Sequence, residues 1–222
     1  MGRPKPLTVE WWRWTQGLTN RPVKGMLTGP YTIADWSFDE HYPNKDAFVM
    51  DLARCLHEEA LDLQRAGCKY LQIDEPAAST RPEEMELVSK AMGVVIENLD
   101  IVTITHVCYG DFHAVFDQIA GIPVDVLDLE MANSNYDLLE FFRERKPDKI
   151  LALGVIDVHS HEVESVEGME RGIRKALEIM PPERLWIYPD CGLKTRTEDE
   201  SLAKIRNVME AVRRVRRDLD LV

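Results

Sequence analysis

The feature that most limits the possible folds of this chain is a regular alternation of short apolar segments with longer amphipathic ones. The short segments are rich in β-branched and large apolar residues, which is typical of buried strands. Strands of this kind in repeated βα units predict a parallel sheet covered by helices. The six candidate strands are residues 23–29, 69–74, 101–107, 125–131, 149–155 and 184–190.

The amphipathic segments predict helices between these strands. In the first long one, apolar side chains recur near one face and Gly67 follows as the expected C-terminal cap. Ser165 is the expected N-cap of a later helix, with Gly168 at the third helical position. The helix nearest the C-terminus is rich in Arg and Glu, so we expect it at the surface. The expected helices are residues 45–66, 82–99, 166–180 and about 198–217.

Two α/β architectures fit this order of elements: an open doubly wound sheet and a (β/α)₈ barrel of the TIM type. No glycine-rich phosphate loop follows an early strand, which disfavours a dinucleotide-binding sheet. Polar residues gather where the strands end, as functional residues do in TIM barrels. Only six strands are expected, so a barrel of this chain lacks its first two βα units. We expect a single domain over residues 1–222, with a helix within residues 1–20 and βα repeats over residues 21–222.

A candidate metal site begins with His106 and Cys108 in the segment "IVTITHVCYGDF". Residues two apart on a strand point to the same face, so both side chains can turn toward the mouth of a barrel. For an isolated pair, the competing interpretation is a buried thiol beside a core histidine. Glu130 and Cys191, however, stand at the ends of two later strands, and neighbouring strand ends lie only about 5 Å apart. One histidine, two cysteines and one glutamate suit tetrahedral Zn²⁺.

Two thiolates and a carboxylate make an electron-rich site, which suits a zinc ion that activates an incoming thiol as thiolate. The carboxylate is the ligand that we expect to yield its place to a substrate. The remaining cysteines, Cys55 and Cys68, lie in or just after an expected helix, and we interpret them as packing residues. The long, irregular cysteine spacings do not favour disulfides.

Charge and composition argue against several classes of partner. The 222-residue chain has a net charge of −12, which argues against nucleic acids and anionic membranes as main partners. It has no apolar window long enough for a membrane span, and its N-terminus lacks the apolar core of a signal peptide. A cytoplasmic location is therefore expected.

Several segments resemble the C-terminal catalytic barrel of cobalamin-independent methionine synthase. They are "VKGMLTGPYTIADWSF", "LQIDEPA", "THVCYGDF", "GVIDVHS" and "PPERLWIYPDCGLKTR", in the order of that family. The resemblance runs from about residue 4 to the end of the chain. It implies transfer of a methyl group from 5-methyltetrahydrofolate, usually a polyglutamate, to homocysteine, giving methionine.

The resemblance also implies roles for individual residues. His106, Cys108, Glu130 and Cys191 match the zinc ligands of the family. Asp74 matches the residue that binds the amino group of homocysteine and shares in proton handling, and Glu75 lies near the same site. His159 matches the proposed proton donor to the folate leaving nitrogen, and Trp36 matches a tryptophan that contacts the pterin.

The chain also departs from the family pattern. It starts after the strands that hold a serine-containing loop and a glutamate for homocysteine. It has "ASTRP" after "IDEPA", where the family usually has Leu-Arg-Glu, so an acidic substrate contact is missing. Three alternatives therefore stand beside methionine synthesis from methyl-folate. They are a methyl-corrinoid protein as donor, a zinc alkyltransferase for another thiol such as coenzyme M, and a non-catalytic fragment whose barrel is completed by a second copy or a partner chain.

Two further groups allow more than one interpretation. Lys194 and Arg196 can bind an anionic tail or simply solvate a loop. The cluster Trp11, Trp12 and Trp14 places aromatic rings on more than one face of the expected first helix. We expect these rings to pack, either in the core or where missing strands or a partner would lie.

Overall fold

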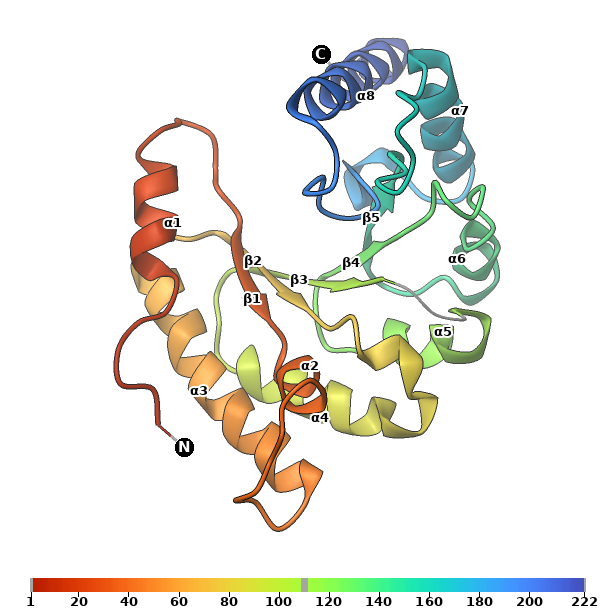
Figure 1. Ribbon diagram of the computed structural model, residues 1–222. Coiled ribbons are helices and arrows are strands. Elements are labelled where there is room, and N and C mark those ends of the chain that lie inside the picture. Colours follow the sequence, from red (N-terminus) through yellow and green to blue (C-terminus); the bar gives the residue numbers. More distant parts are fainter. Residues whose placement is uncertain (1, 109–111, 222) are drawn as a thin grey trace. The chain divides into compact units, whose positions relative to one another are not determined.

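The computed structural model describes residues 2–108 and 112–221, without the side chains of residues 112–114. Six parallel strands form one sheet in the order β1-β2-β3-β4-β5-β6, with flanking helices (Figure 1). This confirms the α/β class and the six strands expected from the sequence. Residues 109–111, which belong to the segment "THVCYGDF", lie outside the described residues.

Each strand lies within its predicted segment and is shorter than it. The apolar side chains of β2 to β5 are largely buried, as expected for a parallel sheet that helices cover, whereas Met26 of β1 is exposed and the residues of β6 are half-buried. The strands are β1 Gly25–Thr28, β2 Tyr70–Asp74, β3 Val102–Val107, β4 Val126–Leu129, β5 Ile150–Gly154 and β6 Leu185–Tyr188.

The chain divides into two compact units between Leu127 and Asp128. The helices of the first unit are α1 Val9–Gln16, α2 Pro30–Asp35, α3 Lys45–Arg65, α4 Met85–Val95 and α5 Phe112–Ala120. The longest of them, α3, is capped by Asn44, whose side chain accepts a hydrogen bond from the Ala47 amide at 2.9 Å. Just beyond α3, Gly67 has a φ of +101°, so the predicted glycine stop is confirmed.

The helices of the second unit are α6 Leu139–Arg145, α7 Val166–Leu177 and α8 Glu198–Asp218. The side chain of Ser165 caps α7 by accepting from the Gly168 amide at 3.1 Å, as predicted. A capping box formed by Thr197 and Glu200 starts α8. The two long helices α7 and α8 pack side by side in this unit (Figure 1).

Some expectations about the helices need correction. The helix expected over residues 82–99 is shorter, because a 3₁₀ turn over Pro82–Glu84 precedes α4 and the helix ends at Val95. The short helices α2, α5 and α6 were not predicted, since helices of six to nine residues give little periodic signal. Of the three N-terminal tryptophans, Trp12 packs in the core, whereas Trp11 and Trp14 are exposed, so core packing holds for Trp12 alone and packing of the other two against a partner stays a prediction. An amphipathic helix buries only the face that meets its neighbour.

No helix among the described residues combines the length and the apolar character needed to cross a membrane. The single domain expected over residues 1–222 stays a prediction.

Candidate functional site

In the first unit, the sheet register aligns the polar residues at the carboxyl ends of three neighbouring strands. Thr28 of β1 pairs with Asp74 of β2, and Asp74 pairs with His106 of β3. The parallel pairing places these residues in one row, because parallel strands in register end at the same edge. The predicted clustering of strand-end residues is confirmed within this unit.

The backbone of the His106–Cys108 segment is held by the loop that follows β2. The Glu75 amide donates to the His106 carbonyl oxygen at 3.0 Å. The Ser79 hydroxyl donates to the Cys108 carbonyl oxygen at 3.2 Å. Both His106 and Cys108 are buried, so their side chains are shielded from bulk solvent.

Glu75 is fully buried, and its carboxylate binds the first turn of α2. One oxygen accepts from the Tyr31 amide at 3.1 Å, and the other accepts from the Thr32 amide at 2.8 Å and the Thr32 hydroxyl at 2.6 Å. Burial raises the pKa of Glu75 to about 7, although these donors oppose the rise. Gly29 makes room for the carboxylate, since a Cβ at that position would lie 2.1 Å from the Glu75 Cδ.

The Glu75 carboxylate therefore holds the first turn of α2 in place, a structural role that the sequence did not indicate. Its expected role in substrate binding stays a prediction. Trp36 ends the helix that Glu75 supports, and the residue is 68% exposed. Asp74 receives a hydrogen bond at 2.6 Å from the Gln72 side-chain amide, and Gln72 is itself bonded by the Lys24 ammonium. The roles predicted for Asp74 and Trp36 also stay predictions.

In the second unit, Glu130 and His159 lie close together although they follow different strands. Glu130 is buried, and its Oε1 lies 3.9 Å from Nε2 of His159. The Asn133 side-chain amide donates to the other oxygen, Oε2, at 3.1 Å. His159 is 46% exposed on its side chain, so solvent and ligands can reach the imidazole.

The loop that carries His159 is fixed by α8. The His159 amide donates to Asp157 Oδ1 at 2.8 Å. The fully buried Lys204 of α8 donates to the Asp157 carbonyl oxygen at 3.1 Å and to the Glu162 carbonyl oxygen at 2.5 Å. It also forms an ion pair with Glu164 at 2.9 Å. A buried ammonium with this many oxygen partners ties the loop to the helix.

Asp190 precedes Cys191 and is fully buried. Its carboxylate accepts hydrogen bonds from three successive amides, those of Met131 and Ala132 at Oδ1 and that of Asn133 at Oδ2. Burial raises the pKa of Asp190 to about 6, with the three amides acting in the opposite direction. Cys191 follows in the polypeptide and is half-buried.

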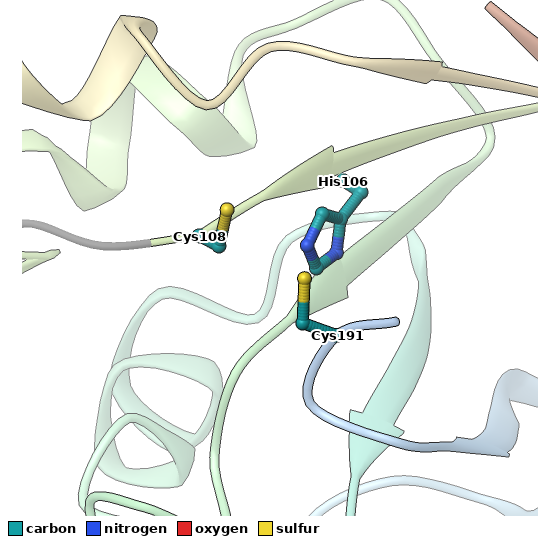
Figure 2. A group of neighbouring side chains, drawn as sticks. All are labelled: His106, Cys108 and Cys191. Carbon is teal, nitrogen blue, oxygen red and sulfur yellow. The ribbon is translucent and has the colours of Figure 1, made fainter. Parts of the chain in front are cut away.

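Among the described residues, His106, Cys108 and Cys191 make up a group that could hold a metal ion (Figure 2). The first two lie at the end of β3, and the third lies in the segment after β6. Glu130, the fourth ligand expected from the sequence, is not a member of that group. Imidazole nitrogen and thiolate sulfur are donors that suit Zn²⁺ and other borderline-soft metals.

Two comparisons decide the family. The family model described as "Cobalamin-independent synthase, Catalytic domain" matches residues 1–214. This chain belongs to that family. A methionine synthase from Pyrococcus abyssi is 39% identical over 97% of the chain. The chain spans 64% of that relative.

Other relatives of this cobalamin-independent synthase domain differ in length. A 5-methyltetrahydropteroyltriglutamate–homocysteine methyltransferase from Nitratidesulfovibrio vulgaris is 39% identical over 99% of the chain, which spans 29% of that protein. Among solved structures, a B12-independent methionine synthase from Shewanella sp., in complex with selenomethionine, superimposes with a TM-score of 0.90 at 27% identity. The superposition covers all of this chain and 70% of the Shewanella protein. The resemblance noted in the sequence is thus confirmed.

Sequence reasoning missed the residues that support the site. Asp190 stood out only as a strand-end residue beside Cys191, and Lys204 and Asn133 gave no signal at all. The side-chain partners of Lys204 are 40 or more residues away in the sequence, and those of the Asp190 carboxylate are 57 or more residues away. The local sequence pattern does not carry such long-range contacts. The two interpretations of Lys194 and Arg196 stay open: Lys194 is exposed, and Arg196 donates to the Thr195 hydroxyl at 3.3 Å.

Proposed function

We propose that this domain catalyses the zinc-dependent transfer of a methyl group to the thiol of homocysteine, which gives methionine. The observation that carries the proposal is the group of one imidazole and two thiols, His106, Cys108 and Cys191, within a chain of the cobalamin-independent synthase family. The names of the Pyrococcus and Nitratidesulfovibrio relatives support homocysteine as the acceptor and methionine as the product.

The residues fit a zinc ion by their chemistry. His106 offers a neutral ring nitrogen, and Cys108 and Cys191 offer sulfur, the donors found in tetrahedral zinc sites. Glu130 would supply the fourth, oxygen ligand. Zinc bound by these residues would lower the pKa of a substrate thiol, so that the thiol reacts as the nucleophilic thiolate at neutral pH. The burial of His106 and Cys108 excludes water from their side of the site.

Side chains near these residues would handle the substrates and the proton. A methyl group bound to a tertiary amine needs protonation of its nitrogen to leave, and an exposed imidazole such as His159 can donate that proton. Glu130, 3.9 Å from the His159 ring, would hold the ring in orientation. Asp74 would bind the ammonium group of homocysteine, and the exposed Trp36 ring offers a stacking face for a pterin.

A metal-binding experiment with matched cysteine variants tests this proposal. Cys108→Ser removes a proposed ligand, whereas Cys68→Ser removes another buried thiol whose Sγ donates to the Tyr70 carbonyl oxygen at 3.2 Å. We expect about one equivalent of zinc in the wild type and in Cys68→Ser, and less than about half an equivalent in Cys108→Ser. Folded wild-type protein that binds no zinc, or equal zinc content in both variants, would falsify the proposal.

An activity assay separates the possible methyl donors. Homocysteine is incubated with the zinc-loaded protein and either 5-methyltetrahydrofolate triglutamate or methylcobalamin, and methionine is measured. We expect methionine from the methyl-folate, the donor named for the Nitratidesulfovibrio relative. Methionine formed only from methylcobalamin would assign a methyl-corrinoid donor instead. No methionine from either, with full zinc content, would favour a fragment that needs a partner chain, and a mass measurement in solution would then follow.

A further inference from the structure

We infer that Asp190 is a positioning residue that sets the placement of two proposed metal ligands, Glu130 and Cys191. The inference rests on the proposed function, because it assumes that these two residues bind the metal. It concerns only the second unit, from Asp128 onward.

The hydrogen bonds of Asp190 connect the two ligand-bearing segments. Its Oδ1 accepts from the Met131 amide at 2.9 Å and the Ala132 amide at 3.0 Å, and its Oδ2 accepts from the Asn133 amide at 3.0 Å. These three residues directly follow Glu130 in the chain. Because Asp190 is joined to Cys191 by one peptide bond, a single buried carboxylate holds the backbone beside both ligands.

The fold leaves space for this carboxylate at a glycine. In the sheet, β5 lies between β4 and β6, so Asp190 after β6 must reach across β5 to the segment after β4. Gly154 ends β5, and a Cβ there would lie 2.0 Å from Asp190 Oδ1. The Asp190 amide donates to the Ile156 carbonyl oxygen at 2.9 Å, which fixes the aspartate backbone against the same segment.

One of the fixed residues also contacts the Glu130 carboxylate. The backbone amide of Asn133 binds Asp190, while its side-chain amide donates to Glu130 Oε2 at 3.1 Å. Loss of the Asp190 carboxylate would therefore release the turn that orients the Glu130 side chain. Substitution of a residue that hydrogen-bonds to a metal ligand and orients it typically weakens metal binding by about 10–100-fold.

Asp190→Asn tests this role because it keeps the shape and removes one acceptor oxygen and the charge. Its amide NH₂ would then face a backbone N–H. The matched control is Asp125→Asn, whose carboxylate also accepts from a neighbouring strand, at 2.7 Å from the Thr103 amide and 2.8 Å from the Thr103 hydroxyl. Asp125 and Thr103 lie at the amino-terminal ends of β4 and β3, away from the ligand-bearing ends.

The readouts are zinc affinity, from competition with a chelator, and the visible absorption spectrum of the cobalt-substituted protein. We expect Asp190→Asn to bind zinc about 10–100-fold more weakly and to change the cobalt spectrum, while Asp125→Asn keeps wild-type zinc affinity. If Asp190→Asn does not fold, Gly154→Ala gives the same test, because it keeps every hydrogen-bonding group and displaces the carboxylate.

Each outcome bears on a separate claim. Folded Asp190→Asn, or Gly154→Ala in its place, with wild-type zinc affinity and an unchanged cobalt spectrum would overturn the role of Asp190 alone. Equal weakening in Asp190→Asn and Asp125→Asn would also overturn it, because a general loss of stability would then account for both. Wild-type protein that fails to bind zinc would overturn the proposed function together with this role.

Discussion

Replacing Lys204 by methionine should destabilise the protein strongly, although the residue lies far along the chain from every predicted site residue except Cys191. The Lys204 ammonium is fully buried in α8 and has four oxygen contacts: the Asp157 and Glu162 carbonyls at 3.1 and 2.5 Å, and both Glu164 oxygens at 3.0 and 2.9 Å. Methionine keeps the apolar stem but leaves these oxygens without their cation.

The expected loss of unfolding free energy depends on how well the Glu164 carboxylate is solvated once its cation is removed. Breaking a buried ion pair by removing one partner costs about 3–5 kcal/mol. The Glu164 side chain is 23% exposed, and its Oε1 still accepts from the Asp157 amide at 2.8 Å, so water and one amide relieve part of the penalty. We therefore expect a loss of about 3 kcal/mol in the free energy of unfolding. This corresponds to a fall in the melting temperature of roughly 6–12 °C for a chain of this size.

Urea unfolding followed by far-ultraviolet circular dichroism measures this loss. The control is Lys175→Met, the same substitution at an exposed position of α7, with an expected change within about 0.5 kcal/mol. The double variant Lys204→Met with Glu164→Gln should recover part of the loss, because the uncompensated carboxylate is gone. A Lys204→Met protein within about 0.5 kcal/mol of the wild type would refute the reasoning.

Two further predictions concern the buried carboxylate of Glu75 and the start of α8. The pKa of Glu75 is raised by burial from 4.5 to about 7, so the stability that its protonated form contributes is present below pH 4.5 and is lost as the pH rises through 7. Glu75→Gln removes this titration. In urea titrations, raising the pH from 4.5 to 8 should therefore lower the unfolding free energy of the wild type by about 3 kcal/mol relative to that of the variant. A constant difference across that range would contradict the assigned pKa. Thr197→Ala breaks the capping box with Glu200 and should cost about 1 kcal/mol in the same assay, whereas an unchanged urea midpoint would show that α8 does not depend on its cap.

The strands could be predicted because each lies in a short segment rich in β-branched and large apolar residues. Burial of both faces requires such runs, so β2 through β5 stand out from the sequence without any knowledge of their partners. The long helix α3 was predictable for a related reason, since its apolar side chains recur with helical period and Gly67 follows it.

The site was predictable only in its donor atoms. His106, Cys108 and Cys191 reveal themselves by residue type and by their place at strand ends. The residues that hold the surrounding backbone could not be recognised in this way. Carboxylates such as Glu75 and Asp190 look like ordinary turn residues in the sequence until their partners are known. The same holds for α2: its N-cap residue, Gly29, offers no side-chain hydrogen bond, and its first amides are bound instead by a residue more than 40 positions later.

The three amides bound by Asp190 have a consequence for the motions of the turn after β4. Amides of a turn ordinarily exchange their hydrogens with solvent quickly, since local opening there costs little free energy. Those of Met131, Ala132 and Asn133 instead donate to a fully buried carboxylate, and they can exchange only when that carboxylate is released. The amide hydrogens of this turn should therefore exchange as slowly as those of the neighbouring strands. This stretch of irregular backbone would then move with the sheet rather than with the loops.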